Sequence, residues 1–225
     1  MTPVDLVLFD LDGTLADTVP DIAAALAATL DEIGVAPPPV SVVTEMVGDG
    51  SRKLIERALA RASAAGDLDA LLARFLVHYR DNLCVGSRLY PGVREALERL
   101  QDAGVARAVV TNKPGALARR LLDSLGLGGS FLAVIGDGDG FPRKPDPGAA
   151  RALIARAGTA AARTALLGDG LPDVRTARTA GTLAIAAGWG YVPPERLRAE
   201  APDLVAATPA EAVAFVLAPK RETAG

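Results

Sequence analysis

Two aspartates, Asp10 and Asp12, directly follow the apolar run from Leu6 to Phe9 and precede Gly13. Carboxylates this close repel each other by about 4 kcal/mol at 4 Å in an effective dielectric near 20, unless a cation or a proton lies between them. Oxygen ligands of this kind favour Mg²⁺, which is often held by one or two carboxylates, waters and substrate phosphate. The same residues also suit a plain tight turn. The pair by itself leaves both interpretations open.

Three later segments carry further polar groups at corresponding places. One apolar run ends in Thr111 and Asn112, a second segment places Lys144 just before a helical stretch, and a third apolar run is followed by Asp169 and Asp173. In open parallel α/β sheets, ligands bind beyond the carboxyl ends of the strands. We therefore expect acids, a hydroxyl, an amide and an ammonium group to meet at one edge of a sheet.

The runs that carry these residues are predicted to be strands buried on both faces of a parallel sheet. They cover residues 4–9, 106–111, 131–136, 164–168 and 183–187. The helical stretches between them run up to Gly104, Gly126 and Gly158, each of which is expected to end a helix in the left-handed conformation. This alternation predicts an α/β fold with a doubly wound parallel sheet.

A long interval separates the first two predicted strands, roughly ninety residues where a single crossover helix needs about a dozen or more. Apolar residues recur at helical spacing through residues 19–86. We expect a four-helix insertion, entered near Asp17 and left near Tyr90, with Pro91 in the first turn of the next helix. The predicted units are a core (residues 1–18 and 88–219), a helical unit (residues 19–87) and a tail (residues 220–225).

The amino-acid composition excludes several kinds of partner and site. Its 225 residues are 50% hydrophobic and carry a formal net charge of −3, without a basic cluster, so nucleic acid is not an expected partner. One cysteine and one histidine exclude an intramolecular disulfide and a His-rich metal site. No stretch approaches the ~18 apolar residues of a membrane span, so no membrane partner is expected. The expected compartment is the cytoplasm, and the oligomeric state is left unknown.

Four segments resemble, in order, the signature motifs of the haloacid dehalogenase superfamily: FDLDGT at 9–14, VVTN at 109–112, KPDP at 144–147 and GDGLPD at 168–173. The resemblance covers essentially the whole chain, and it implies a Rossmann-like core with the helical insertion as a type 1 cap. The segments MVGDG, LYPGV, VVTNKPG and WGY are also similar to those of bacterial phosphoglycolate phosphatases. Hydrolysis of a small phosphate monoester, such as 2-phosphoglycolate, is therefore implied.

The resemblance also implies roles for the core residues. Asp10 would be the nucleophile that becomes an aspartyl phosphate, and Asp12 would be the general acid and base. Thr111, together with the backbone amide of Asn112, would hold phosphoryl oxygens. Lys144 would neutralise the nucleophile and the transferring group.

The implied cofactor is Mg²⁺. Its ligands would be the carboxylates of Asp10 and Asp169 and the backbone carbonyl of Asp12. Asp173 would reach the metal through water or orient Lys144. Dehalogenases of this fold lack the second aspartate of the first motif, so Asp12 favours phosphoryl transfer over cleavage of a carbon–halogen bond.

The segment from Gly48 to Lys53 resembles the loop through which type 1 caps reach the leaving group of the substrate. Gly50 and Arg52 are its candidate substrate-binding residues, because the planar fork of Arg52 suits a substrate carboxylate. The alternative for Arg52 is a solvated arginine at the start of a helix. Lys113 either assists the phosphate site or caps a turn.

Other functions share the core residues. These are phosphatases for a sugar phosphate, an amino sugar phosphate, pyrophosphate or an aminohydroxybenzoate precursor, and phosphomutases. A further alternative is a signalling module that accepts phosphate on an aspartate. Such receivers place the acceptor on a later strand and carry no helical insertion, so the position of Asp10 disfavours that alternative.

Overall fold

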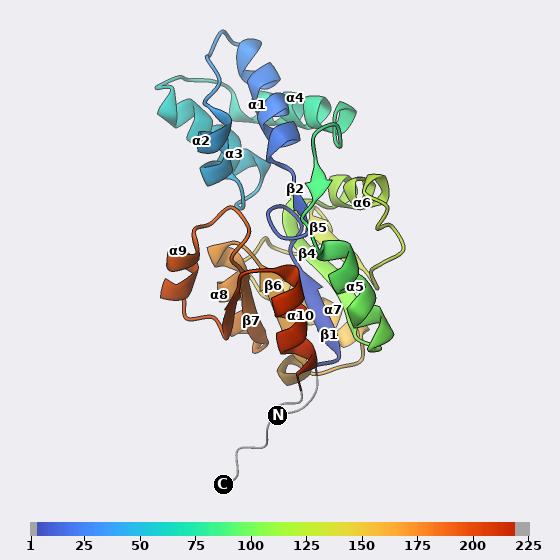
Figure 1. Cartoon of the computed structure of the whole chain (residues 1–225). Coiled ribbons are helices and arrows are strands. Elements are labelled where there is room, and N and C mark those ends of the chain that lie inside the picture. Colours follow the sequence, from blue (N-terminus) through green and yellow to red (C-terminus); the bar gives the residue numbers. More distant parts are fainter. Residues whose placement is uncertain (1–3, 219–225) are drawn as a thin grey trace.

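The computed structural model describes residues 4–218, and the tail expected at residues 220–225 lies outside this range. The chain forms a sheet with helices on both faces and a separate group of helices beyond one edge of that sheet (Figure 1). None of the described helices combines the length and the apolar character that a membrane crossing requires.

Six parallel strands build the main sheet, in the order β5-β4-β1-β6-β7-β8. Their bounds are β1 Leu6–Phe9, β4 Ala106–Pro114, β5 Val134–Asp137, β6 Thr164–Gly168, β7 Leu183–Ala187 and β8 Leu204–Ala206. The chain proceeds outward from β1 in one direction through β4 and β5, and then in the other direction through β6, β7 and β8. The expected doubly wound α/β fold is confirmed, and β1 lies at the point where the strand order reverses.

Alternating side chains of the strands face two different helical layers, as the period of two in a strand requires. Leu6 and Leu8 pack with one layer, whereas Val7 and Phe9 pack with the other. The first layer contains α7 Gly148–Arg156, α8 Leu171–Ala180 and α9 Pro194–Ala199, and a 3₁₀ turn at Ala161–Arg163 precedes β6. The second layer contains α5 Val93–Asp102, α6 Gly115–Ser124 and α10 Pro209–Leu217.

The observed elements differ from the predicted ones at several bounds. Strand β5 begins at Val134 and not at residue 131, and β1 begins at Leu6 and not at residue 4. Strand β8 was not predicted, because it has only three residues. Pro91 precedes α5 and does not lie in its first turn, since Gly92 at a φ of +83° separates the two. Positive φ values at 104, 126 and 158 confirm the three predicted glycine stops.

Four helices occupy the interval between β1 and β4: α1 Val19–Asp31, α2 Val40–Met46, α3 Ser51–Arg61 and α4 Leu68–Asp81. They form the group at the top of Figure 1. Their buried apolar faces, with Leu26, Ile55 and Phe75 among the most buried side chains, pack together in the middle of this group. Asp67 caps α4 by accepting hydrogen bonds from two amides of its first turn. We call this unit the cap.

The two chain segments that join the cap to the core pair with each other. Strand β2 Ala16–Asp17 lies antiparallel to β3 Arg88–Leu89. Next to them, the buried carboxylate of Asp21 accepts hydrogen bonds from the amides of Gly86 and Ser87 and from the Ser87 hydroxyl, over 2.6–2.8 Å. A buried carboxylate needs such donors, and these three tie the entry of the cap to its exit.

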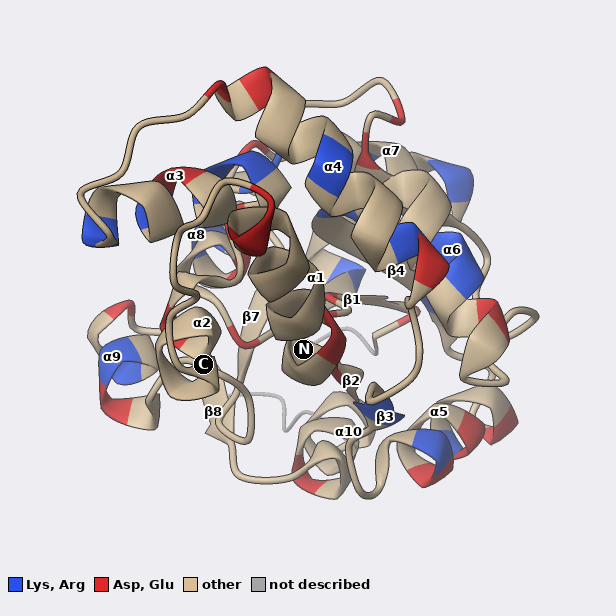
Figure 2. Ribbon diagram, turned by 90° about the horizontal axis from the view of Figure 1, so that it is seen from above, with Lys and Arg blue, Asp and Glu red and all other residues tan. Residues whose placement is uncertain are grey.

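The view from above, through the cap, shows acidic and basic residues interspersed over the helices on this side (Figure 2). This distribution agrees with the near balance of 24 basic and 27 acidic residues in the sequence.

Candidate active site

Asp10 leaves the end of β1 with its side chain buried beneath the cap. The ammonium nitrogen of Lys144 lies 2.9 Å from Asp10 Oδ1 and 2.6 Å from Asp173 Oδ1. Apart from this ion pair, the buried Asp10 Oδ1 has no hydrogen-bond donor in the part of the chain that the structure describes. A carboxylate oxygen can bind more than one partner, so this atom can accept a cation beside Lys144.

The donor set around that oxygen fits a divalent cation. Carboxylate oxygens of Asp10, Asp169 and Asp173, all buried, lie within 4.8 Å of one another. The ammonium group of Lys144 pairs with two of these three acids, Asp10 and Asp173, which leaves excess negative charge in a buried site. A set of three carboxylates with this excess of negative charge fits a hard cation such as Mg²⁺.

Asp169 is held from both sides at the end of β6. Its Oδ1 accepts a hydrogen bond of 3.0 Å from the Thr14 hydroxyl, and its Oδ2 accepts one of 2.8 Å from the Tyr191 amide. A Cβ atom at Gly13 would lie 2.2 Å from Asp169 Oδ2, and Gly13 has a φ of +82°. Only glycine fits there, which explains the glycine of the first motif.

Burial dominates the ionisation of these acids. It raises the pKa of Asp10 from 3.8 to about 6, against the opposing charge of Lys144. Burial, reinforced by the charge of Asp10, also raises the pKa of Asp169 well above its usual range. Burial alone would lower the pKa of Lys144, but the neighbouring charges of Asp10 and Asp173 outweigh it and raise that pKa. Lys144 is therefore charged at neutral pH.

These shifts predict how the metal-free protein responds to pH. Because the folded pKa of Asp10 exceeds its usual 3.8, protonated Asp10 stabilises the fold at low pH, and this contribution is lost as pH rises through about 6. Relative to Asp10→Asn, the free energy of unfolding should fall by on the order of 2–3 kcal/mol between about pH 4 and pH 7. Urea unfolding in EDTA across this range measures it. If the free energy of unfolding of the wild type, relative to that of Asp10→Asn, stays constant or grows with pH, the raised pKa of Asp10 is contradicted.

The end of β4 supplies two groups of the second motif. Thr111 is buried beside the pocket, and its hydroxyl accepts a long hydrogen bond of 3.3 Å from the Lys113 amide. The side chain of Asn112 donates to the carbonyls of Gly48 and Lys144 and accepts from the Lys144 amide at 2.8 Å. Asn112 thereby fixes the Lys144 loop and fastens it to the cap loop at Gly48.

Asp12 is not one of the three clustered acids. Its Oδ1 accepts hydrogen bonds from Lys113 Nζ at 2.9 Å and from the Thr18 hydroxyl at 2.7 Å. Lys113 Nζ also donates to the Tyr79 hydroxyl of α4 and lies 4.4 Å from the centre of the Tyr79 ring. Asp10 and Asp12 therefore sit in different surroundings, as two carboxyls with different roles require.

A pocket lies between the core and the cap, above these groups. The core contributes polar residues to its wall, and the cap contributes mainly apolar ones. The lining residues are Asp10, Asp12, Thr111, Asn112 and Lys113 from the core, and Ile22, Val47, Gly48, Gly50, Ser51, Leu54, Phe75 and Tyr79 from the cap.

With this geometry in view, the sequence can be compared with known proteins. Residues 4–181 match the family model described as haloacid dehalogenase-like hydrolase. The chain belongs to this family. The membership expected from the four motifs is thus confirmed.

This haloacid dehalogenase-like hydrolase has curated relatives over most of its length. It is 40% identical over 204 residues to a protein of Agrobacterium fabrum named phosphoglycolate phosphatase, covering 89% of this chain and 87% of that protein. It is 41% identical over 192 residues to one of Rhodospirillum rubrum with the same name, covering 82% and 80%. A crystal structure of a predicted phosphoglycolate phosphatase from Haemophilus somnus 129pt matches with a TM-score of 0.88 at 28% identity, covering 96% of this chain and 99% of that one.

The two cap candidates of this hydrolase lie in different places. Gly50 precedes α3 at a φ of +89° and lines the pocket, where the position of a Cβ atom would be 3.2 Å from the Arg143 guanidinium carbon. Arg52, by contrast, pairs with Asp69 of α4 on the surface of the cap and is absent from the pocket lining among the described residues. The structure thus does not bring Arg52 to the site, because a nearer acid on the cap binds its guanidinium.

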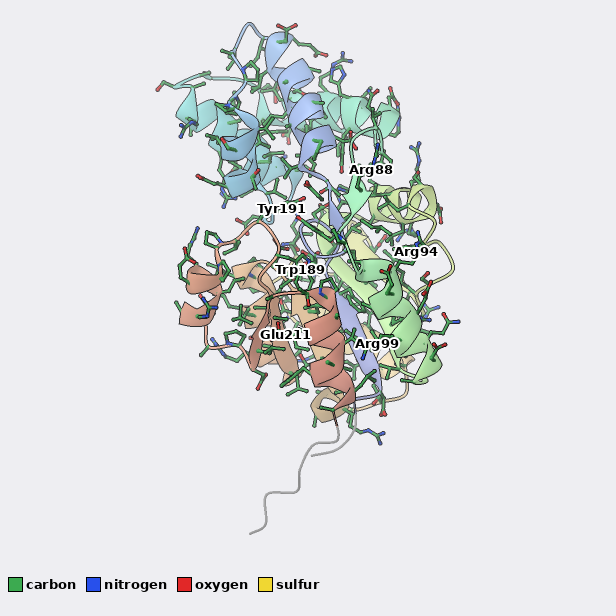
Figure 3. The ribbon with its side chains drawn as sticks, in the orientation of Figure 1. Arg88, Arg94, Arg99, Trp189, Tyr191 and Glu211 are labelled. Carbon is green, nitrogen blue, oxygen red and sulfur yellow. The ribbon has the colours of Figure 1, made fainter. Side chains whose placement is uncertain are left out.

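From the sequence, Trp189 and Tyr191 are expected to pack in the core or to line the mouth of the site, and their hydrogen bonds around the site were not predicted. The Tyr191 hydroxyl accepts a hydrogen bond of 2.7 Å from the Thr18 amide and donates one of 3.1 Å to Asp17. Trp189 Nε1 donates to the Thr14 carbonyl at 3.1 Å. Both aromatic residues lie at the junction of core and cap (Figure 3). The WGY segment marks them, but nothing in the sequence relates it to contacts more than 170 residues away.

Proposed function

We propose that this chain is a Mg²⁺-dependent phosphatase of small phosphate monoesters, with 2-phosphoglycolate as its substrate. The observation that carries the proposal is Asp10 at the pocket, with its carboxylate within 4.8 Å of the buried carboxylates of Asp169 and Asp173, a set that fits a cation. The names of relatives about 40% identical to this chain support the substrate.

Two steps make up the proposed reaction. In the first, an Asp10 oxygen attacks phosphorus, the bond from phosphorus to the ester oxygen breaks, and Asp12 gives its proton to the departing alkoxide. In the second, Asp12 takes a proton from a water molecule that attacks the aspartyl phosphate, which releases phosphate and restores Asp10. The separate surroundings of the two carboxyls support this division.

The other core residues hold the phosphoryl group. The Thr111 hydroxyl and the Asn112 amide would donate to its oxygens, and Lys144 would neutralise its charge. Asp173 would orient Lys144, because its Oδ1 binds Lys144 Nζ while its Oδ2 accepts a hydrogen bond of 2.9 Å from the Gly170 amide.

Residues Asp10 and Asp169, with the backbone carbonyl of Asp12, would hold the metal. When bound, Mg²⁺ would neutralise part of the negative charge of the phosphoryl group. The cytoplasmic location and the lack of a nucleic-acid partner stay predictions.

A substrate panel tests the proposal. Purified protein is assayed for phosphate release from 2-phosphoglycolate, ethyl phosphate, sugar phosphates and pyrophosphate, each with Mg²⁺ and with EDTA. We expect Mg²⁺-dependent turnover, with the highest kcat/KM for 2-phosphoglycolate. Absence of turnover on every monoester would refute the phosphatase, and turnover of sugar phosphates alone would refute the substrate. A requirement for a bisphosphate primer with slow phosphate release would indicate a mutase.

The position of Arg52 predicts that its replacement has little effect on activity. Because Arg52 pairs with Asp69 at the surface, and exposed ion pairs contribute about 0–1 kcal/mol, Arg52→Ala should change kcat/KM for 2-phosphoglycolate by less than about 3-fold. Steady-state kinetics with 2-phosphoglycolate and ethyl phosphate measure this. A loss confined to 2-phosphoglycolate would return Arg52 to the substrate site.

A further inference from the structure

We infer that Lys113, together with Tyr79, binds the carboxylate of the substrate and thereby selects phosphate esters that carry an acid group beside the ester oxygen. This inference rests on the proposed function and names the residues that determine its specificity.

The cap side of the pocket leaves few ways to bind a charged leaving group. Leu54, Ile22, Phe75 and Val47 make that wall largely apolar. Of the cations among the described residues, Lys113 is part of the pocket wall, whereas the Arg143 guanidinium lies next to Gly50 and pairs with Asp137 at 2.7 Å. An anionic group that enters a buried, mostly apolar space needs a cation or strong donors. Lys113 is therefore the group in position to bind it.

The position of Lys113 relative to Asp12 fits this role. Asp12 is the proposed acid for the ester oxygen, and Lys113 Nζ lies 2.9 Å and 3.2 Å from its two carboxylate oxygens. In 2-phosphoglycolate a single methylene group separates the ester oxygen from the carboxylate. When the ester oxygen is beside Asp12, the carboxylate is thus beside the ammonium group that contacts Asp12.

The hydrogen-bonding capacity of the pair allows a further ligand. An ammonium group has three N–H donors, and Lys113 Nζ donates to Asp12 Oδ1 at 2.9 Å, to Asp12 Oδ2 at 3.2 Å and to the Tyr79 hydroxyl. The bond to Asp12 Oδ2 is the longer of the two to Asp12, whose other oxygen stays bound to Lys113. Tyr79 accepts from Lys113, so its own proton is directed elsewhere, and burial raises its pKa well above 10 and keeps the hydroxyl protonated. A substrate carboxylate would take the N–H of the 3.2 Å contact from Asp12 Oδ2 with one oxygen and accept the Tyr79 O–H with the other.

The two donors come from different units of the protein. Lys113 belongs to β4 of the core, and Tyr79 belongs to α4 of the cap. Both side chains are buried, and the Tyr79 ring also stacks with Phe75 at 5.6 Å between centroids, which fixes its position. A carboxylate bound by both would join the cap to the core.

The test compares two esters that differ only in the group concerned. Ethyl phosphate has a methyl group where 2-phosphoglycolate has its carboxylate. We measure kcat/KM for both in the full-length protein with Mg²⁺ and take their ratio. In Lys113→Met the ratio of 2-phosphoglycolate to ethyl phosphate should fall by about 10- to 100-fold, the effect of losing a hydrogen bond to a charged group. Tyr79→Phe should lower it by about 5-fold.

The ratio separates binding of the carboxylate from positioning of Asp12. If Lys113 only holds Asp12, both esters lose equally and the ratio is unchanged, which would overturn the inference. If Lys113→Met does not fold, the ratio in Tyr79→Phe decides in the same way. Arg156→Met, at an exposed cation in the last turn of α7 and outside the pocket lining, is the matched control and should leave the ratio unchanged. If the wild-type protein hydrolyses neither ester, the proposed phosphatase itself is refuted. An unchanged ratio, by contrast, refutes only the assignment of Lys113.

Discussion

Replacement of Asp10 by asparagine is expected to lower phosphate release by about 10⁴-fold or more, because an amide cannot act as the nucleophile that forms the covalent intermediate. The fold should persist. Burial already raises the pKa of Asp10 to about 6, so at neutral pH the neutral amide suits the metal-free site better than the charged acid does. We expect the metal-free variant to melt at or above the temperature of the wild type.

The measurements are phosphate release under saturating 2-phosphoglycolate and thermal unfolding in EDTA. Asp102→Asn, at the exposed end of α5, is the matched control and should keep wild-type turnover. Near-native turnover in Asp10→Asn would show that another group attacks phosphorus. A large fall in melting temperature would show that the acid is needed for folding.

Replacement of Lys144 by methionine should damage both catalysis and stability. Its ammonium group lies between the buried carboxylates of Asp10 and Asp173, so its loss leaves both without their cation. Breaking a buried ion pair in this way costs about 3–5 kcal/mol. We expect a comparable drop in the free energy of unfolding and a loss of kcat of roughly 10³-fold, because the transferring group loses a neutralising charge.

Added Mg²⁺ should restore part of the stability of Lys144→Met, since a cation bound by the remaining acids compensates for the missing charge. Urea unfolding with EDTA and with Mg²⁺ measures this, and Lys53→Met serves as a control at an exposed lysine. Equal stabilisation of wild type and variant by Mg²⁺ would contradict the electrostatic explanation. A variant as stable as the wild type in EDTA would contradict the ion-pair account altogether.

The local pattern of the chain was sufficient to predict much of the fold. Strands 164–168 and 183–187 were predicted with the observed bounds, because fully buried parallel strands appear as short continuous apolar runs. Strand β8 was missed, because its three residues pair with β7 only in the context of the complete sheet. The acids and the lysine of the site were found because each motif follows or precedes an element whose type is evident from sequence.

Contacts between distant segments could not be predicted in this way. Arg52 was expected to face the substrate on the basis of its loop, but its position depends on Asp69, which lies 17 residues later on another helix. Lys113 follows the second motif, yet its contact with Tyr79 depends on how the cap packs on the core. Asp21 looks like an ordinary acid of a first helical turn, and its three donors come from 65 and 66 residues away.

The pairing of β2 with β3 bears on how the cap is attached to the core. Because the segments that lead into and out of the cap are hydrogen-bonded neighbours, the two covalent links between cap and core lie side by side. These two strands form a sheet separate from the six-stranded one. We therefore expect that lengthening or shortening a helix of the cap leaves the register of the six-stranded sheet unchanged.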